Sequence, residues 1–168
     1  QFSQWLCPSP DGAEVWMRRP MSIYAADRDS GRLQFLYKVV GRGTQGVAQL
    51  EPGDEFNVAG PFGVGFSLDP AWRNVVVIGR GVGLATLGPL SQLAADNGVG
   101  VTAILSARAP ELAMSADLFE AMGAEVVPVL DSDGSSAVDN VEAILERLVA
   151  EERADALFTC GSNRLLAL

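Results

Sequence analysis

The sequence predicts two structural parts, an antiparallel β module over residues 1–68 and an α/β unit with a parallel sheet over residues 69–168. Two observations predict this division. In the first part apolar and polar residues alternate, which is the period of a half-buried strand. Beyond it, short continuous apolar runs alternate with helical patterns, an order typical of βαβ units in a doubly wound sheet. We expect the boundary between residues 67 and 72.

The first part is predicted to contain short strands and one short helix. Strands are expected over 14–26, 32–40 and 55–59, and a helix over 44–50. Within the second strand every other position is apolar, which predicts one common face for Leu33, Phe35, Tyr37 and Val39. Turn-forming residues separate these elements at 27–31, 52–54 and 60–65.

The second part is predicted to contain strands over 74–78, 99–105, 125–130 and 156–159. The first of these is a continuous apolar run, as expected for a strand buried on both faces. Helices are expected over 84–96, from a capping Ser115 to Met122, and over 137–151. The last helix places five apolar residues at helical spacing, which we expect to face the core: Val138, Val141, Ile144, Leu145 and Leu148.

Both ends of the chain are expected to be cut. The opening segment 1–6 has the character of the middle of a strand, and the last residues resemble the start of a further helix. The few strands expected in the first part are not enough to close a barrel and would leave an exposed edge. We therefore expect a partial antiparallel barrel with residues missing at both ends.

Composition excludes several classes of function. A net charge of -9 argues against nucleic acid and against an anionic membrane surface. The chain has no histidine and only two cysteines, Cys7 and Cys160, so histidine-based catalysis and a zinc site are not expected. A cytoplasmic location is the default for this cysteine usage. We expect any chemistry to belong to a bound cofactor.

Two motifs of the first part are candidate anion sites. In Arg18-Arg19-Pro20-Met21-Ser22, an arginine and a hydroxyl three residues apart can neutralise a phosphate and hydrogen-bond a ring. The alternative is an ordinary exposed arginine pair. The segment 36–44 ends a strand in the glycine turn Gly41-Arg42-Gly43-Thr44 before a helix, where backbone N–H groups can approach an anion. The alternative is a simple strand-to-helix turn.

Two further motifs follow strands of the second part. Gly79-Arg80-Gly81-Val82-Gly83 stands where a doubly wound fold binds a pyrophosphate, although the spacing differs from G-x-G-x-x-G. A glycine turn that serves only packing is the alternative. The carboxylate that usually follows the second strand is absent, and Ser106 and Arg108 stand there instead. Cys160 and Gly161 end the fourth strand, where the alternative is a cysteine buried as a small apolar residue.

The order of these motifs is more specific than any one of them. A β module with R-P-x-S, G-x-G-T and G-P-x-G, then an α/β module opening with G-x-G-x-G and closing on C-G, resembles the ferredoxin–NADP reductase superfamily. The segments Arg-Arg-Pro-Met-Ser-Ile and Tyr-Lys-Val-Val-Gly-Arg-Gly-Thr are most similar to the electron-transfer subunits of dihydroorotate dehydrogenase. The resemblance covers nearly the whole chain.

The resemblance implies a FAD-binding barrel over 1–68 and an NAD(P)-binding domain over 69–168, with Arg19 at the flavin phosphates and Ser22 near flavin N5. It assigns to FAD the residues Arg19, Pro20, Met21, Ser22, Leu36, Tyr37, Lys38, Gly43 and Thr44. It assigns to NAD(P) the residues Gly60, Gly63, Gly79, Gly81, Gly83, Cys160 and Gly161. Arg108 is a further candidate for a 2′-phosphate, although the resemblance favours NAD over NADP.

The resemblance also implies a function. Electrons would pass from NAD(P)H through FAD to an iron–sulfur centre or to a partner oxidoreductase subunit, such as a dihydroorotate dehydrogenase-type flavoprotein. The four cysteines that hold a [2Fe-2S] cluster in that group do not occur in this chain, so the cluster is expected only in a further C-terminal region. Two alternatives stay open: a stand-alone or oxygenase-type reductase, and a flavin-less module that binds a partner.

Overall fold

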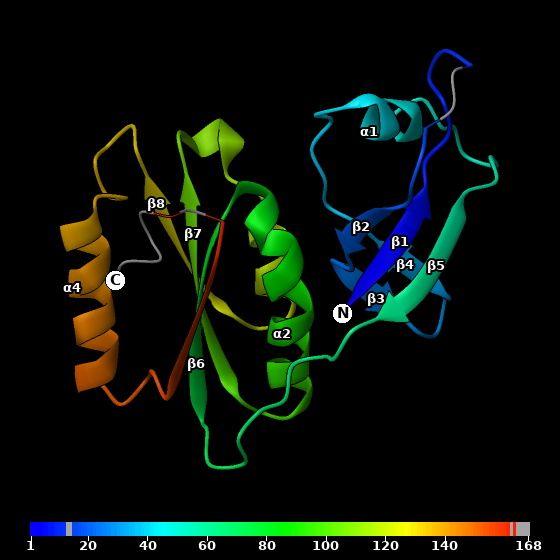
Figure 1. The fold of residues 1–168 in the computed structure, drawn as a ribbon. Helices are drawn as coiled ribbons and strands as arrows, with labels where there is room; N and C mark the ends of the chain where they lie inside the picture. The colour runs from blue at the N-terminus through cyan, green and yellow to red at the C-terminus, as the bar shows by residue number, and fades with distance from the viewer. Residues whose placement is uncertain (13–14, 162, 164–168) are drawn as a thin grey trace. The chain divides into compact units, whose positions relative to one another are not determined.

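The computed structural model describes residues 1–12, 15–161 and 163, and the chain forms two compact units, Gln1–Gly65 and Phe66–Leu168. Their boundary lies just ahead of the predicted one. The first unit contains antiparallel sheets and the second a parallel sheet with helices, as the sequence predicted (Figure 1). Within the described residues no helix is both long and apolar enough to cross a bilayer.

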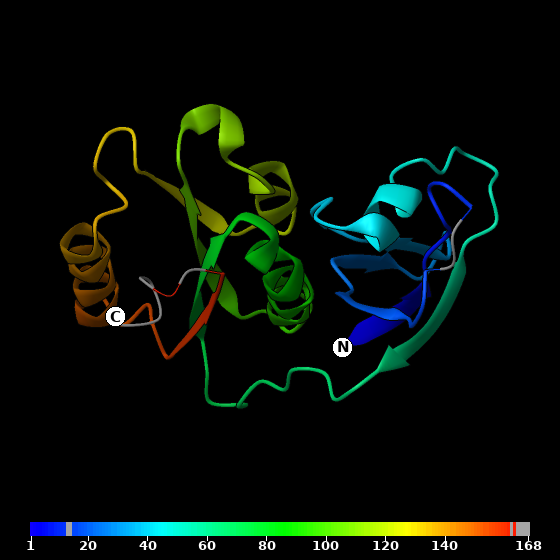
Figure 2. The same cartoon turned by 45° about the horizontal axis from the view of Figure 1, so that its top comes forward.

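The described residues of the first unit form five strands and one helix. Strands β1 (Phe2–Leu6), β2 (Arg19–Ser22) and β5 (Asn57–Phe62) form a sheet of order β2-β1-β5, while β3 (Ala25–Asp27) pairs with β4 (Arg32–Gln34). Every pairing is antiparallel, and Trp5 of β1 stands opposite Arg19 of β2. Helix α1 (Arg42–Val47) lies between β4 and β5 in the chain (Figure 2).

The core of the first unit is centred on Trp5, which is 1% exposed. Three rings meet it edge-on, with centroid distances of 4.9 Å to Phe35, 5.4 Å to Tyr37 and 5.1 Å to Phe56. The indole N–H donates to Ser3 Oγ at 3.0 Å, so the buried ring keeps a hydrogen-bond partner. This core fixes β1 between β2 and β5.

Several predictions for the first unit were wrong in detail. The segment predicted as one strand over 14–26 contains two strands, β2 and β3, and the strand predicted over 32–40 ends at Gln34. Because the chain leaves the strand pairing after Gln34, the four alternate apolar residues do not share one buried face. Phe35 and Tyr37 pack on the core, whereas Leu33 and Val39 are 52% and 54% exposed.

Strand β5 continues to Phe62, into the first half of the glycine-rich segment 60–65 that was predicted to be irregular. The register between β1 and β5 shifts between Phe2 and Gln4. At this shift Gly60 adopts a φ of 145°, and a Cβ on it would lie 3.2 Å from the carbonyl oxygen of Phe2. Gly60 therefore allows the strand to pass the irregularity, because it has no side chain to collide with β1.

The second unit contains a parallel sheet of order β8-β7-β6-β9. Its strands are β6 (Asn74–Arg80), β7 (Gly100–Ala107), β8 (Glu125–Leu130) and β9 (Ala156–Cys160). Helices α2 (Leu84–Asp96) and α4 (Val138–Ala150) cover opposite faces of the sheet (Figure 1). Helix α3 (Ala116–Ala121) precedes β8, and short 3-10 helices occupy Gly81–Gly83 and Pro110–Leu112.

Both faces of the parallel sheet are buried. On one face α4 contributes Val141 and Leu148 to a core with Val76, Ile78, Ile104 and Val129, all at most 1% exposed. On the other face α2 buries Leu84, Leu87 and Leu90. The rings of Phe66 and Trp72 pack against Phe158 of β9. The apolar runs of the sequence are explained by this double burial.

The predicted elements of this unit differ from the observed ones mainly at their ends. Strand β6 extends to Arg80, so the first glycine of the Gly79–Gly83 motif belongs to the strand. Ser115 does precede α3, but its side chain forms no capping hydrogen bond and its φ is 71°. The prediction of a serine cap was therefore wrong, because the chain enters α3 through a left-handed residue.

Candidate functional site

The first two motifs meet at one cavity in the first unit. Its volume is about 180 Å³, and it is lined by Arg19, Met21, Val40, Gly41, Arg42, Gly43 and Thr44. Strand β2 supplies the arginine and the methionine, and the turn into α1 supplies the rest. The structure thus brings together segments that are about twenty residues apart in sequence.

Arg19 lies at the start of β2 and is half-buried. Its Nη1 donates to the carbonyl oxygens of Trp16, at 3.1 Å, and Met17, at 3.0 Å. These bonds hold the preceding loop against the side chain. Burial raises the pKa of the Cys7 thiol, and the positive charge of Arg19 partly offsets this rise. The positive charge of Arg19 therefore interacts with Cys7, which packs against Gly43 of the cavity lining.

The glycine turn is held by Thr44. Its Oγ1 accepts from the backbone N–H groups of Val40, at 3.0 Å, and Gly41, at 3.2 Å, and it donates to the carbonyl oxygen of Gly41 at 3.0 Å. Thr44 is only 6% exposed. A Cβ on Gly43 would lie 3.2 Å from Cys7 Sγ, so this glycine is also closely packed. Both residues shape the turn that lines the cavity.

The other residues assigned to FAD do not belong to the lining of this cavity. Ser22 pairs with Phe2 in the sheet, Tyr37 packs on Trp5, and Lys38 is exposed. Pro20 is exposed and Leu36 is half-buried. The resemblance did not assign Val40, Gly41 or Arg42 to FAD, although all three line the cavity. The turn itself, flanked by an assigned strand and helix, was the signal that could have found them.

Gly60 and Gly63, assigned to NAD(P), both lie against Phe2 in the first unit. Gly63 has a φ of 77°, and a Cβ there would be 3.3 Å from the Phe2 ring. Together with the close approach of Gly60 to β1, this contact accounts for both glycines by packing alone. Their assignment to the nucleotide stays a prediction.

The carboxyl ends of β6, β7 and β9 carry the remaining assigned residues. A Cβ on Gly79 would lie 2.3 Å from Leu84 Cδ2, and one on Gly161 would lie 2.4 Å from the carbonyl oxygen of Arg80. Packing therefore requires both glycines. Gly81 differs, because its φ is 56° and the nearest atom to a Cβ there is Met114 Cε at 4.0 Å. The space that a side chain at Gly81 would enter is therefore open.

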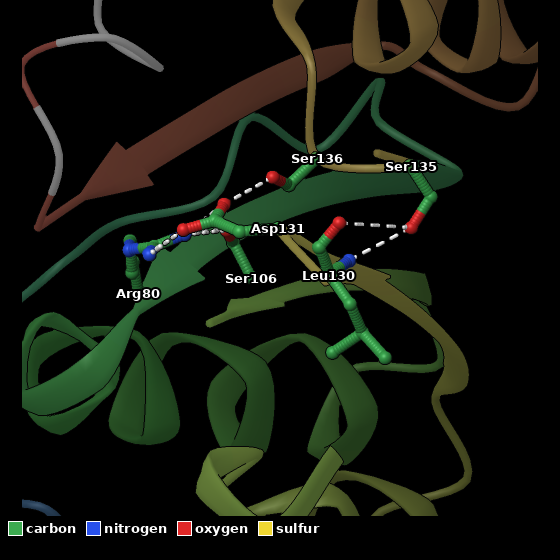
Figure 3. Close-up of polar contacts among 6 residues, drawn as sticks. All are labelled: Arg80, Ser106, Leu130, Asp131, Ser135 and Ser136. Carbon is green, nitrogen blue, oxygen red and sulfur yellow. Dashed lines mark hydrogen bonds and ion pairs between the residues drawn. The ribbon is translucent and has the colours of Figure 1, made fainter. Parts of the chain in front are cut away.

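Arg80 forms the main polar cluster at this edge (Figure 3). Its Nη1 donates to Ser106 Oγ at 2.8 Å and to Asp131 Oδ1 at 3.1 Å, and its Nη2 donates to Asp131 Oδ2 at 2.6 Å. The Ser136 hydroxyl also donates to Asp131. Sequence reasoning missed Asp131 because it looked for a carboxylate after β7, whereas this one follows β8.

Arg108 is exposed at the end of β7, where its carbonyl oxygen accepts from Ser132 N at 3.0 Å. Among the described residues its side chain forms no ion pair, with Glu111 or with any other carboxylate. The structure therefore shows Arg108 as an exposed side chain.

Comparisons with known proteins bear on these arrangements. No protein-family model matches the chain. The dihydroorotate dehydrogenase B (NAD(+)) electron transfer subunit of Desulforamulus reducens is 34% identical over 150 residues, which are 89% of this chain and 57% of that protein. The same subunit of Enterococcus faecalis is 31% identical over 157 residues, 92% of this chain and 59% of that protein.

The chain is related to the electron transfer subunits of dihydroorotate dehydrogenase B. It spans about three fifths of their length. Among solved structures, the NADH-dependent reduced ferredoxin-NADP oxidoreductase is 25% identical with a TM-score of 0.77, over 99% of this chain and 58% of that one. The ferredoxin-NADP+ reductase of Plasmodium falciparum shares the fold, with a TM-score of 0.68 at 14% identity, over 99% of this chain and 72% of that one. The predicted ferredoxin–NADP reductase fold is thereby confirmed.

Proposed function

We propose that this chain is an electron-transfer flavoprotein module, in which residues 1–68 bind FAD and residues 69–168 bind NAD(P)H. One observation carries the proposal: the segments 18–22 and 36–44 meet at a single cavity in an antiparallel unit that precedes a parallel, nucleotide-type sheet. The relatives named as electron transfer subunits support it, as does the NADH-dependent oxidoreductase of the same fold.

The residues around the first cavity fit an anionic flavin phosphate. Arg19 contributes a fixed positive charge, and charge-assisted hydrogen bonds to phosphate are among the strong ones. Gly41 and Gly43 leave the backbone without side chains beside the same space. Met21 contributes an apolar wall that can pack against a ring face. The cavity thus offers a positive charge and exposed backbone for the phosphates, and an apolar side chain for the flavin ring.

When bound, FAD would supply the chemistry that accepts a hydride and releases electrons. The residues of the chain bind and orient. Arg19 holds the phosphate end, while Met21 and Ser22 lie further along the same strand. Gly81 lets the nucleotide pyrophosphate approach the turn before α2, the usual place in a doubly wound sheet. No side chain is assigned a proton in this proposal, so the site acts by positioning.

The electrons are proposed to pass to an iron–sulfur centre or to a catalytic subunit of the dihydroorotate dehydrogenase type, because the relatives are named as electron transfer subunits of that enzyme. We also propose NAD rather than NADP as the nucleotide, which the NAD(+) in those names supports. A cytoplasmic location is proposed from the cysteines, which are both free.

The test uses the full-length protein reconstituted with FAD. We expect a yellow protein with one FAD per chain that NADH bleaches under anaerobic conditions. Arg19→Ala should weaken FAD binding at least tenfold, because one charge-assisted bond to phosphate contributes about 1.5–3 kcal/mol. Arg28→Ala removes the same charge from the exposed β3–β4 turn and should leave FAD bound. A colourless wild-type protein in excess FAD would favour the flavin-less alternative.

A second measurement distinguishes the electron-transfer subunit from a stand-alone reductase. The reduced protein is mixed with a dihydroorotate dehydrogenase-type catalytic subunit, and then separately with free flavin or ferredoxin. Rapid reoxidation by the catalytic subunit, with formation of a complex, is the expected result. Reoxidation by ferredoxin or free flavin alone would favour the stand-alone reductase.

A further inference from the structure

The carboxyl edge of the parallel sheet carries an ion pair that the proposed function does not explain. Arg80 ends β6 and holds both carboxylate oxygens of Asp131, which follows β8. Its Nη1 also donates to Ser106 near the end of β7. The pair therefore crosses the ends of three neighbouring strands (Figure 3). Pairing through both nitrogens fixes the plane of the guanidinium as well as its position.

Asp131 brings a negative charge to the place where a nucleotide-binding sheet usually needs one. Enzymes that prefer NAD commonly have an acidic residue at the end of the second strand, where it accepts from the ribose 2′-OH. Here the second strand, β7, ends in Ser106 and Ala107. The backbone N–H of Asp131 donates to the carbonyl oxygen of Ala107 at 3.0 Å. The carboxylate thus reaches the end of β7 from the neighbouring strand.

The loop after β8 holds this carboxylate in one orientation. Ser136 is 2% exposed, and its hydroxyl donates to Asp131 Oδ1. The backbone N–H of Ser136 donates to the carbonyl oxygen of Leu130 at 3.0 Å, and Leu130 N donates to Ser135 Oγ at 2.8 Å. These bonds tie the far end of the loop, at Ser135 and Ser136, to the last residue of β8. The position of Asp131 is therefore set by the fold.

The pair acts differently on the two forms of the nucleotide. A guanidinium without a partner attracts a phosphate group and binds it through two hydrogen bonds. The carboxylate of Asp131 already binds the guanidinium of Arg80. Its negative charge also repels a 2′-phosphate. A neutral 2′-hydroxyl is not repelled.

We propose that Asp131 is a specificity-determining residue, which excludes the 2′-phosphate of NADP(H) by holding Arg80 and admits the 2′-hydroxyl of NAD(H). This inference rests on the proposed function, because it requires the nucleotide to bind at this edge of the sheet.

The test measures binding of 5′-AMP and 2′-phospho-AMP to the full-length protein by titration calorimetry, which does not depend on flavin chemistry. Wild type is expected to prefer 5′-AMP. Asp131→Asn keeps the shape and removes the charge, so 2′-phospho-AMP should bind about tenfold more tightly, with 5′-AMP changed by less than about twofold. Asp133→Asn removes a charge from the same loop, where Asp133 bonds to Ser135 rather than Arg80, and should keep the wild-type ratio.

Arg80→Gln supplies a second measurement if Asp131→Asn is poorly folded. The uncompensated Asp131 should then weaken 2′-phospho-AMP several-fold more than 5′-AMP. The inference is overturned if Asp131→Asn keeps the wild-type ratio, or if either variant changes both ligands equally, because a purely structural pair would do so. If wild type binds the AMP ligands tightly but Asp131→Asn leaves their affinity ratio unchanged, this inference is refuted and the proposed nucleotide site is not. If neither ligand binds wild type, the proposed nucleotide site is refuted as well.

Discussion

Gly83 lies so close to Cys160 that a Cβ added to the glycine would be 2.5 Å from the cysteine carbonyl oxygen. The same Cβ would also be 2.8 Å from Gly161 Cα. The turn after β6 is therefore seated directly on the end of β9, and the third glycine of the Gly79–Gly83 motif is explained by this contact. Packing therefore accounts for Gly79 and Gly83, and Gly81 remains the glycine of this motif that we propose for nucleotide binding.

Gly83→Ala is expected to destabilise the second unit. The atoms that this Cβ would meet belong to the backbone and cannot rotate away as a side chain would, so the turn must shift. Overpacking of this kind costs about 1–3 kcal/mol. Thermal unfolding followed by circular dichroism should show a lower Tm for Gly83→Ala than for wild type. An unchanged Tm would mean that the turn and β9 separate more easily than the structure indicates.

Gly81→Ala is expected to affect the nucleotide more than the fold. There is space for a methyl group at this position, and the positive φ costs an alanine about 1–2 kcal/mol. A side chain on the open turn should hinder the approach of a pyrophosphate. We expect a KM for NADH raised at least fivefold, with kcat changed much less. Equal KM values for wild type and variant would place the pyrophosphate elsewhere.

Trp5→Ala is expected to unfold or nearly unfold the first unit. The indole is buried among three rings, and removing a large buried aromatic side chain costs about 3–5 kcal/mol. Trp16→Ala is the matched control, because Trp16 is 74% exposed and its change should stay within about 0.5 kcal/mol. Urea unfolding of both variants measures the difference. Similar losses for the two tryptophans would contradict the described core.

Asp155 is expected to make stability depend on pH. Its carboxylate accepts from the backbone N–H groups of Arg73, at 2.7 Å, and Asn74, at 2.8 Å, and these bonds lower its pKa from the ordinary value of 3.8. A lowered pKa gives a contribution that is present above 3.8 and is lost as the pH falls through the folded pKa. Wild type should therefore lose its Tm advantage over Asp155→Asn on acidification from pH 7 to below 3.8.

The control for this pH profile is Glu142→Gln on the exposed side of α4. Its Tm difference from wild type should vary with pH much less than that of Asp155→Asn. A constant Tm difference for Asp155→Asn across the same range would show that the two backbone bonds do not depend on the carboxylate charge.

Arg108→Ala is expected to leave the nucleotide preference unchanged. The side chain is exposed at the end of β7 and is not held by an ion pair among the described residues. The measurement is kcat/KM for flavin reduction by NADH and by NADPH, in wild type and variant. A preference for NADPH that disappears in the variant would instead make Arg108 the ligand of a 2′-phosphate.

The sequence predicted the second unit more accurately than the first. Strand β8 and helix α2 were predicted with their observed bounds. In the first unit, Phe35 and Tyr37 follow the end of β4 and reach the core outside any ladder. Periodicity within one strand carries no information about such a departure.

The candidate sites show the same contrast. Arg19 and the turn 41–44 could be found from local motifs, since each motif is continuous in the sequence. Asp131 could not, because its partner Arg80 is 51 residues away and belongs to a strand that is not even its neighbour in the sheet. Pairing between distant strand ends depends on topology, which a single sequence motif does not contain.

The strand order β8-β7-β6-β9 has a consequence for how the protein folds during synthesis. Strands β6, β7 and β8 leave the ribosome in the order in which they pair, whereas β9 must return to β6, and the hydrogen bond from Arg73 to Asp155 spans 82 residues. Until β9 is made, β6 presents an unpaired apolar edge, which is a template for aggregation. We expect nascent chains that end before residue 156 to require chaperones, and full-length chains to be released from them.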